Sequence, residues 1–343
     1  MGDFLPWLTF FFSAAVVVAA GSQLARHGDH IAKETGIGGL WIGVVLIASA
    51  TSLPEIVTDV TAAWIEKPDL AAGDLFGSSM TNMMVLAVID LLHRQRRVWQ
   101  SASQGHTLVA GLAIVLTSVA DALINADLGW SIGHVGVDTI GLALLYVLGA
   151  RVVFRQQYLE ARLRIAGEAT QRASTGKDPV PPGLRLPSRG SLLGLAAAAG
   201  FILVAAPFLA TSAADISEIT GLQESFVGVT FLAITTSLPE LATAIAAVRL
   251  GSYDLAVGNL FGSNAFNVLV FLFADIAYRP GPLFSDVADA QVLAALMAIL
   301  LTATGMMGII YRAERRFFLL EPDAVAVILG YVAGMLLIYQ AGT

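Results

Sequence analysis

The sequence Thr51-Ser52-Leu53-Pro54-Glu55 recurs as Thr236-Ser237-Leu238-Pro239-Glu240, and these two stretches decide the fold. A second shared string follows each of them: Gly73-Asp-Leu-Phe-Gly-Ser78 with Asn82, and Gly258-Asn-Leu-Phe-Gly-Ser263 with Asn267. The copies stay in one register throughout, without an insertion, and nearly half of positions 43–82 match positions 228–267. Unrelated apolar helices rarely keep Pro, Glu, Ser and Asn in register, so the chain contains an internal duplication.

The composition places the duplication in a membrane. The chain has 343 residues, of which 56% are hydrophobic and 13% charged, against roughly 25% charged in a soluble domain. Several apolar runs reach the ~20 residues that cross a bilayer. The start of the chain lacks the basic region of a signal peptide, so the first apolar run is expected to be a true span. We therefore predict an all-α polytopic membrane protein.

Hydropathy and helix breakers predict ten transmembrane helices. Their expected ranges are 4–24, 38–65, 69–92, 105–125, 131–153, 191–213, 225–249, 254–277, 287–310 and 322–340. If the N-terminus is outside, Lys67 and Arg279 are the only two of the 19 Lys and Arg residues in outer loops. The positive-inside rule therefore predicts that both termini lie outside.

This topology gives the two halves opposite directions. The span with Glu55 runs from inside to outside, and the span with Glu240 runs from outside to inside. The halves are then inverted five-helix repeats, residues 1–153 and 191–343, with motifs at 43–82 and 228–267. A cytoplasmic linker, 154–190, joins them; it is expected to be helical over 156–172 and flexible afterwards. Inverted repeats are typical of secondary transporters, whose ion sites lie where the repeats meet.

Glu55 and Glu240 lie near the middle of their spans, where an ionised carboxylate costs several kcal/mol unless it is paired or hydrated. Every Lys and Arg maps to a loop or a helix end, so none is expected to pair with these glutamates. The compensating charge must come from a metal cation, sodium ions or protons.

The neighbouring residues supply oxygen ligands. Pro54 and Pro239 lack an N–H and so free the carbonyls of Ala50 and Thr235. Further oxygens come from the side chains of Thr51, Ser52, Ser78, Asn82, Thr236, Ser237, Ser263 and Asn267. Calcium takes 6–8 such ligands, and sodium accepts the same oxygens. Zinc and copper prefer His or Cys, and the chain has no cysteine. The paired Gly73/Gly77 and Gly258/Gly262 predict close helix approach.

The paired T-S-L-P-E and G-[DN]-L-F-G-S-x-x-x-N strings resemble the two α-repeats of the cation/calcium exchanger superfamily, particularly its prokaryotic sodium/calcium exchangers. The resemblance implies that Glu55 and Glu240 are the chief calcium ligands. It implies sodium sites from the oxygens of Thr51, Ser52, Ser78, Thr236, Ser237 and Ser263, with the carbonyls of Ala48 and Ala233. The chain departs from the pattern at Ala50 and Thr235, and Asp74 stands where the second repeat has Asn259.

A charge argument predicts the mode of transport. With Asn at positions 82 and 267, we expect two formal negative charges in the core, which one Ca²⁺ neutralises. The empty carrier would hold two bare carboxylates in a low-dielectric cavity and so resist switching sides. This favours exchange over uniport. Replacing one Ca²⁺ by three Na⁺ would move one charge per cycle, worth ~2.3 kcal/mol per 100 mV.

Three further aspartates have weaker assignments. Asp59 lies one turn outward of Glu55 and is interpreted as a vestibule residue or as the partner of a polar group. Asp90 and Asp275 occupy equivalent positions of the two repeats and are expected to be solvated helix ends.

The predicted function is a Ca²⁺/Na⁺ antiporter of a prokaryotic inner membrane that works by alternating access. The alternative on the same fold is Ca²⁺/H⁺ exchange; a cation channel is a less favoured interpretation. We expect no enzyme, because no zinc or nucleophile-elbow signature occurs. No cofactor, nucleic acid or obligate protein partner is expected; the expected partners are the lipid bilayer, Ca²⁺ and Na⁺, with H⁺ in the alternative.

Overall fold

The computed structural model describes residues 4–35, 51–93, 97–173, 187–311 and 322–341. The first half contains α1 (Phe4–Thr35), α3 (Leu53–Trp64), α4 (Pro68–Leu92), α5 (Val98–Ser101), α6 (His106–Ala126), β1 (Ser131–Ile132), β2 (Val135–Gly136) and α7 (Val137–Ala173). The second half contains α8 (Arg189–Thr220), α9 (Glu224–Val227), the π-helix η1 (Gly228–Leu232), α10 (Ala233–Thr236), α11 (Leu238–Arg249), α12 (Tyr253–Ala277), the 3₁₀ helix η2 (Leu283–Asp286), α13 (Ala290–Tyr311) and α14 (Pro322–Ala341).

The fold is that of a polytopic helical membrane protein with two inverted five-helix repeats. Eight of the described helices are long and apolar enough to cross a bilayer, and the broken segment Glu224–Arg249 makes a ninth. The predicted span 38–65 is described only from residue 51 onward, so its first part lies outside the described residues. The predicted count of ten is consistent with this arrangement.

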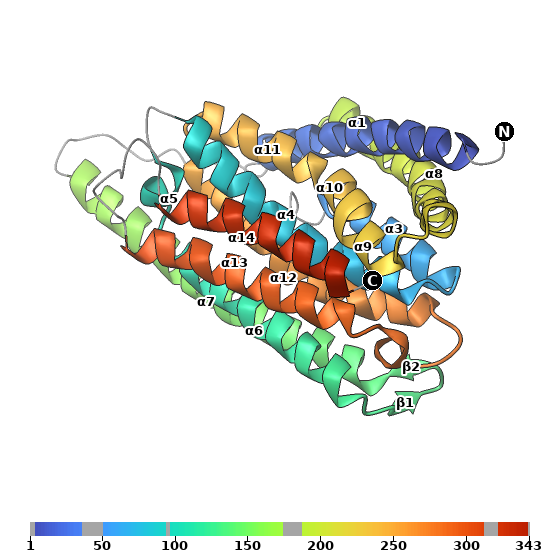
Figure 1. The fold of residues 1–343 in the computed structure, drawn as a ribbon. Coiled ribbons are helices and arrows are strands. Elements are labelled where there is room, and N and C mark those ends of the chain that lie inside the picture. The colour runs from blue at the N-terminus through green and yellow to red at the C-terminus, as the bar shows by residue number, and fades with distance from the viewer. Residues whose placement is uncertain (1–3, 36–50, 94–96, 174–186, 312–321, 342–343) are drawn as a thin grey trace.

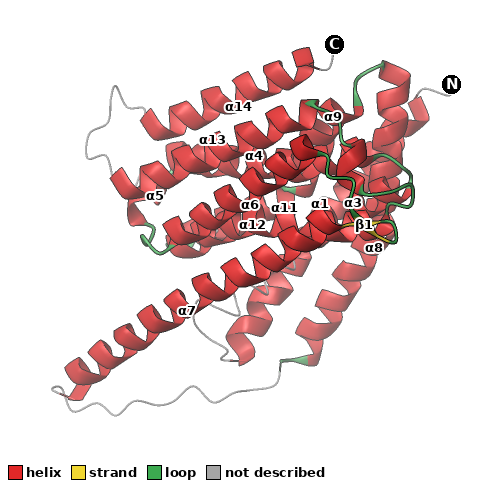
Figure 2. Cartoon of the chain, turned by 90° about the horizontal axis from the view of Figure 1, so that it is seen from below, coloured by secondary structure: helices red, strands yellow, loops and turns green. Residues whose placement is uncertain are grey.

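The fifth predicted span begins later than expected. Residues 131–136 form a hairpin in which Ser131 pairs with Gly136 and Ile132 with Val135. Helix α7 begins only at Val137. Gly129 and Gly133 have positive φ, and this backbone conformation is incompatible with an α-helix over these residues. The helix then runs without a break to Ala173, well beyond the apolar segment; Figure 2 shows it projecting from the bundle.

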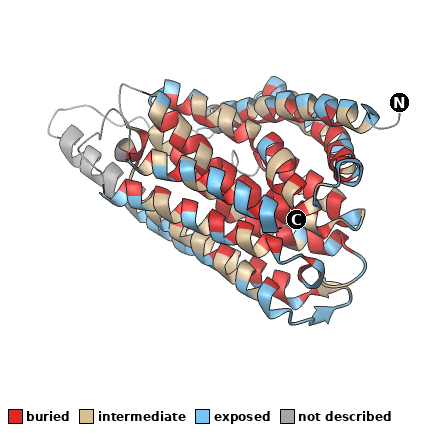
Figure 3. Ribbon diagram, in the orientation of Figure 1, coloured by how far each residue is buried: buried red, intermediate tan, exposed pale blue. Residues whose placement is uncertain are grey.

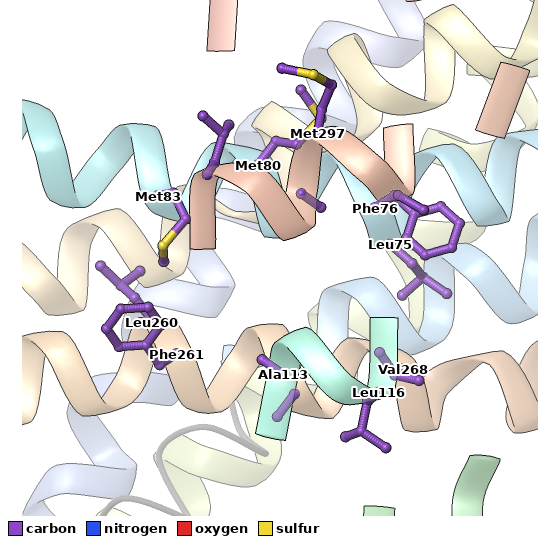
Figure 4. Close-up of a cluster of buried hydrophobic side chains, with 14 of the residues drawn as sticks. Leu75, Phe76, Met80, Met83, Ala113, Leu116, Leu260, Phe261, Val268 and Met297 are labelled. Atoms are coloured by element: carbon purple, nitrogen blue, oxygen red, sulfur yellow. The ribbon is translucent and has the colours of Figure 1, made fainter. Parts of the chain in front are cut away.

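The core of the bundle is built on α4 and α12, which carry the two G-x-L-F-G-S strings. Their side chains pack with those of α6 and α13 in one apolar cluster (Figure 4). Phe271 of α12 contacts both Phe76 of α4 and Phe284 of η2, with ring centroids 5.1 Å apart in each case. The motif helices therefore pack together at the centre of the molecule.

The outer helices present apolar side chains outward. Figure 3 shows exposed residues along the outer surface and buried residues along the inner faces. Exposed residues on α1, α7 and α8 include Phe11, Phe12, Leu148, Phe201 and Phe208. Helices α1 and α8 lie side by side along much of their length (Figure 1). Such outward apolar surface belongs against lipid rather than water.

Contacts between the halves follow a two-fold relation. Oδ1 of Asp69 accepts a hydrogen bond from the backbone N–H of Ala288 at 2.8 Å, and Oδ1 of Asp254 accepts one from Ser103 at 2.6 Å. In the register of the duplication, Asp254 is the counterpart of Asp69, and Ala288 is the counterpart of Ser103. The pseudo-two-fold rotation that superimposes one repeat on the other therefore superimposes these two hydrogen bonds on each other.

Asp90 and Asp275 are not solvated helix ends, and that prediction was wrong. Both are buried. Oδ1 of Asp90 accepts from the N–H of Val98 at 2.6 Å, and Oδ1 of Asp275 accepts from Leu283 at 2.8 Å. Each carboxylate thus satisfies the backbone of the loop that follows its own helix, as buried N–H groups require.

Candidate cation-binding site

The two T-S-L-P-E stretches form breaks in their helices. Ser52 is a turn residue before α3, and Ser237 separates α10 from α11. The segments on either side of Ser237 are bent by 41°. Pro239 removes the N–H that Thr235 would otherwise receive, and the wide turn of η1 precedes it. A π-helical turn of this kind often accompanies a functional site.

Helix α1 packs directly on these breaks. A side chain at Gly21 would clash with the ring of Pro239, and its Cβ would lie 3.7 Å from the ring of Pro54. Glycine at this position therefore lets α1 approach both prolines at once, and the two breaks lie close to each other.

The two glutamates are buried in the centre of the protein. Glu55 is 1% exposed and Glu240 0% exposed. The two carboxyl groups are neighbours across the repeats, and the side chain of Thr51 lies beside the Glu240 carboxyl group. Within the part of the chain that the structure describes, neither glutamate forms an ion pair with Lys or Arg.

Several buried oxygens of the two repeated motifs have no hydrogen-bond partner. Within the described ranges these are Glu55 Oε2, both Glu240 carboxylate oxygens, and the oxygens of Ser52, Ser237, Ser263, Asn82 and Asn267. Each unmade hydrogen bond of a buried polar group costs free energy. An oxygen that accepts no hydrogen bond keeps its lone pairs free. Such lone pairs can coordinate a cation.

The side-chain oxygens of Asn82 and Asn267 accept no hydrogen bond, whereas the side-chain nitrogens of both residues donate one. Nδ2 of Asn82 donates to Oδ1 of Asn264 at 2.9 Å, and Nδ2 of Asn267 donates to the carbonyl of Leu75 at 3.4 Å. The amide donors are thereby occupied by protein oxygens. The amide oxygens of Asn82 and Asn267 remain available as ligands.

Thr236 and Ser78 meet across the interface of the repeats. Their hydroxyl oxygens are 3.3 Å apart. Ala233 is buried beside them, and its carbonyl accepts from the N–H of Ser237 at 3.2 Å. Ala48, the predicted counterpart of Ala233, lies outside the described residues.

Close approach of helices at Gly73 and Gly77 is confirmed. A Cβ on Gly73 would lie 2.9 Å from the carbonyl oxygen of Ser225, and one on Gly77 would lie 2.6 Å from Cα of Val229. These glycines bring α4 against the segment that ends in Thr236. A Cβ on Gly258 would meet the ring of His106, and Gly262 has no such neighbour among the described residues.

Asp74 belongs to this site, which the sequence analysis missed. It is completely buried, and its Oδ1 accepts from the hydroxyls of Thr236 at 2.9 Å and Ser78 at 3.3 Å. The only signal in the sequence was its mismatch with Asn259. Asp59 is also completely buried and interacts with Asp74 on α4, so its interpretation as the partner of a polar group fits the structure and its interpretation as a vestibule residue does not. The core therefore holds four carboxyl groups, where the sequence analysis counted two.

The carboxyl groups do not form a ready-made metal cluster. Among the described residues, no three His, Cys, Asp or Glu side chains converge on one metal position. A cation at this site would be held by two carboxylates together with neutral oxygens. That combination suits Ca²⁺ and Na⁺ and does not suit zinc.

Comparison with known proteins identifies the family. The family model described as "Sodium/calcium exchanger protein" matches residues 5–155 and 190–340. The chain belongs to this family. Its members are transporters rather than enzymes, and they carry Ca²⁺ and Na⁺ as substrates. The cation/Ca²⁺ exchange that the sequence predicted is thus confirmed at the level of the family.

Individual relatives agree with this assignment. The chain is 30% identical to inner membrane protein YrbG of Escherichia coli over 78% of both chains. It is 27% identical to the putative antiporter CaxA of Alkalimonas amylolytica over 88% of this chain and 90% of that one. The solved structure of the sodium-calcium exchanger NCX_Mj has the same fold, with a TM-score of 0.63 and 17% identity over 97% of this chain and 98% of that one.

Proposed function

We propose that this family member is an antiporter that exchanges Ca²⁺ for Na⁺ by alternating access. Glu55 and Glu240 are the shared ligands of the calcium ion. The observation that carries the proposal is the set of buried oxygens without a hydrogen-bond partner that the two repeated motifs contribute, the two carboxylates included. This set is rich in hydroxyl and amide oxygens, which Na⁺ needs and which a proton, bound by a carboxylate alone, does not need.

The remaining oxygens complete the cation positions. Ser52, Ser237, Ser263, Asn82 and Asn267 offer donor-free oxygens. Thr51, Ser78 and Thr236, with the carbonyls of Ala48 and Ala233, are the further ligands of the sodium ions. The donor-free oxygens and the further sodium ligands both come from the two repeats. A movement of one repeat against the other therefore opens the same oxygens to one side of the membrane or to the other.

The proposed topology has both termini outside the membrane. Residues 1–153 and 191–343 are the two repeats, and 154–190 is the cytoplasmic connection between them. The distribution of Lys and Arg supports this orientation. The relative YrbG is named an inner membrane protein, and we assign this chain to the same kind of membrane.

Uptake of ⁴⁵Ca²⁺ into proteoliposomes tests the coupling ion. Vesicles loaded with Na⁺ are diluted into Na⁺-free buffer at equal pH, and parallel vesicles carry a pH gradient without sodium. Uptake driven by the sodium gradient supports the proposal. Uptake driven only by the pH gradient assigns the protein to Ca²⁺/H⁺ exchange, and no driven uptake under either gradient would exclude calcium as the cargo.

A further inference from the structure

Asn264 of α12 connects a proposed cation ligand to the helices around it. Its side chain is buried, and its Oδ1 accepts a hydrogen bond from Nδ2 of Asn82 at 2.9 Å. Its own Nδ2 donates to the backbone carbonyl of Ser79 at 3.2 Å and to the hydroxyl of Thr302 at 3.4 Å. One amide group therefore contacts α4 through Asn82 and Ser79, and α13 through Thr302.

This chain of hydrogen bonds determines which end of the Asn82 amide is free. A backbone carbonyl can only accept, so the carbonyl of Ser79 holds the nitrogen of Asn264. The oxygen of Asn264 then holds the nitrogen of Asn82 and leaves Oδ1 of Asn82 without a hydrogen bond. A reversed Asn82 amide would bring two oxygens together and would leave an N–H group free instead. Only the observed orientation offers a cation ligand, because a cation is bound by amide oxygens.

The equivalent asparagine of the second repeat is held in a different way. In the register of the duplication, Ser79 is the counterpart of Asn264. The hydroxyl of Ser79 donates to the Leu75 carbonyl of its own helix at 3.1 Å, and Nδ2 of Asn267 donates to the same carbonyl at 3.4 Å. Asn267 is therefore held by a backbone group, whereas Asn82 is held by a side chain that a substitution can remove.

We propose that Asn264 is a positioning residue for calcium binding, which acts by holding the Asn82 amide with its oxygen free for the cation. This inference rests on the proposed function, in which Asn82 is a ligand. A hydrogen-bond partner that orients a metal ligand contributes about 10–100-fold to affinity. Loss of the Asn264 amide is expected to weaken calcium binding by about tenfold, the lower end of that range, because a neutral amide orients a neutral ligand.

Equilibrium binding of ⁴⁵Ca²⁺ to the purified full-length protein tests this role in a double-mutant cycle. The four proteins are the wild type, Asn264→Ala, Asn82→Ala and the double variant. Asn125→Ala is the matched control, because it makes the same change at an exposed asparagine near the end of α6. The control should bind calcium as the wild type does.

Because Asn264 acts through Asn82, its removal should matter only while Asn82 is present. Asn264→Ala should raise the Kd for calcium by about tenfold in the wild-type background, and by less than about twofold in the Asn82→Ala background. Equal increases in the two backgrounds would show that Asn264 acts on the protein in general and would overturn the proposal. Asn264→Ser, which installs the shorter residue of the first repeat, takes the place of Asn264→Ala in the cycle if the alanine variant does not fold.

The binding cycle does not involve the coupling ion, so its outcome is separate from that of the transport assay. An unchanged Kd in either Asn264→Ala or Asn82→Ala would overturn the role of Asn264. Wild-type protein that binds calcium but shows no sodium-driven uptake would instead overturn the proposed function, and the cycle would still decide whether Asn264 positions Asn82.

Discussion

The hydroxyl of Thr236 donates a hydrogen bond to Oδ1 of Asp74 across 2.9 Å. The donor lies at the helix break of the second repeat and the acceptor in the motif helix of the first. The bond therefore joins the two repeats directly at the candidate site. Ser78 donates to the same oxygen at 3.3 Å, so the three side chains form one connected group of oxygens.

Replacing Thr236 by Val should weaken sodium coupling. The substitution removes one hydroxyl oxygen from the proposed sodium ligands and one donor from Asp74, a loss of about 1–3 kcal/mol. We expect the sodium concentration that half-activates calcium uptake to rise by roughly tenfold, or about 1.4 kcal/mol. Thr236→Ser keeps the hydroxyl and should stay near the wild type. Equal sodium dependence in the Val and Ser variants would contradict the role of this hydroxyl.

Replacing Gly77 by Ala should destabilise the folded protein. The added Cβ would lie 2.6 Å from Cα of Val229 and 2.7 Å from Cβ of Ala233, and overpacking of this kind costs about 1–3 kcal/mol. Thermal unfolding of the purified protein in detergent should show a lower Tm. Gly111→Ala on α6 is the control, since a Cβ there meets no described atom within 4 Å. A Tm for Gly77→Ala at or above that of the control would show that the helices are not in close contact at this position.

Replacing Asp275 by Ala should also lower the Tm. The decrease should be larger than the one caused by replacing a partly exposed aspartate by Ala. Its carboxylate accepts from the N–H groups of Gly136 and Leu283 at 2.7 and 2.8 Å, and from the hydroxyl of Thr139. Each donor left without a partner costs about 1–3 kcal/mol. Asp121→Ala, at a partly exposed position, is the control in the same unfolding measurement. Equal Tm values for the two variants would mean that Asp275 does not hold the hairpin and the η2 loop.

The absence of cysteine makes the topology directly measurable. Single cysteines at Ser131 in the β-hairpin and at Gln104 before α6 lie on opposite sides of the membrane in the proposed orientation. In intact cells, an impermeant maleimide should label Ser131→Cys and leave Gln104→Cys unmodified until the membrane is opened. The reverse pattern would place both termini inside.

The regularity of the duplication made much of the fold predictable. Its constant register fixes which helices correspond, and the pattern of Lys and Arg gives the halves opposite directions. The sequence also showed that Pro54 and Pro239 interrupt the helical hydrogen bonding one residue before each glutamate, because proline has no N–H to donate. These features depend on local chemistry, which a sequence shows directly.

The features that were missed depend on which elements meet in space. Asp74 was interpreted as a variation within a motif, and its place in the site follows only from the approach of Thr236 across the repeat interface. Asp59 was placed on the correct helix face, but helix periodicity does not show what covers that face. Asp90 and Asp275 were misinterpreted because their partners are loop N–H groups whose path the sequence does not give.

The most direct test of the central claim is sodium-driven ⁴⁵Ca²⁺ uptake by Glu55→Gln and Glu240→Gln, each reconstituted separately beside the wild type and Asp121→Asn. The two glutamates come from different repeats but are proposed to share one calcium ion. Each single variant should therefore fall to the level of protein-free vesicles, whereas Asp121→Asn should retain wild-type uptake. Substantial sodium-driven uptake in either glutamate variant, with the protein correctly folded, would contradict a shared site.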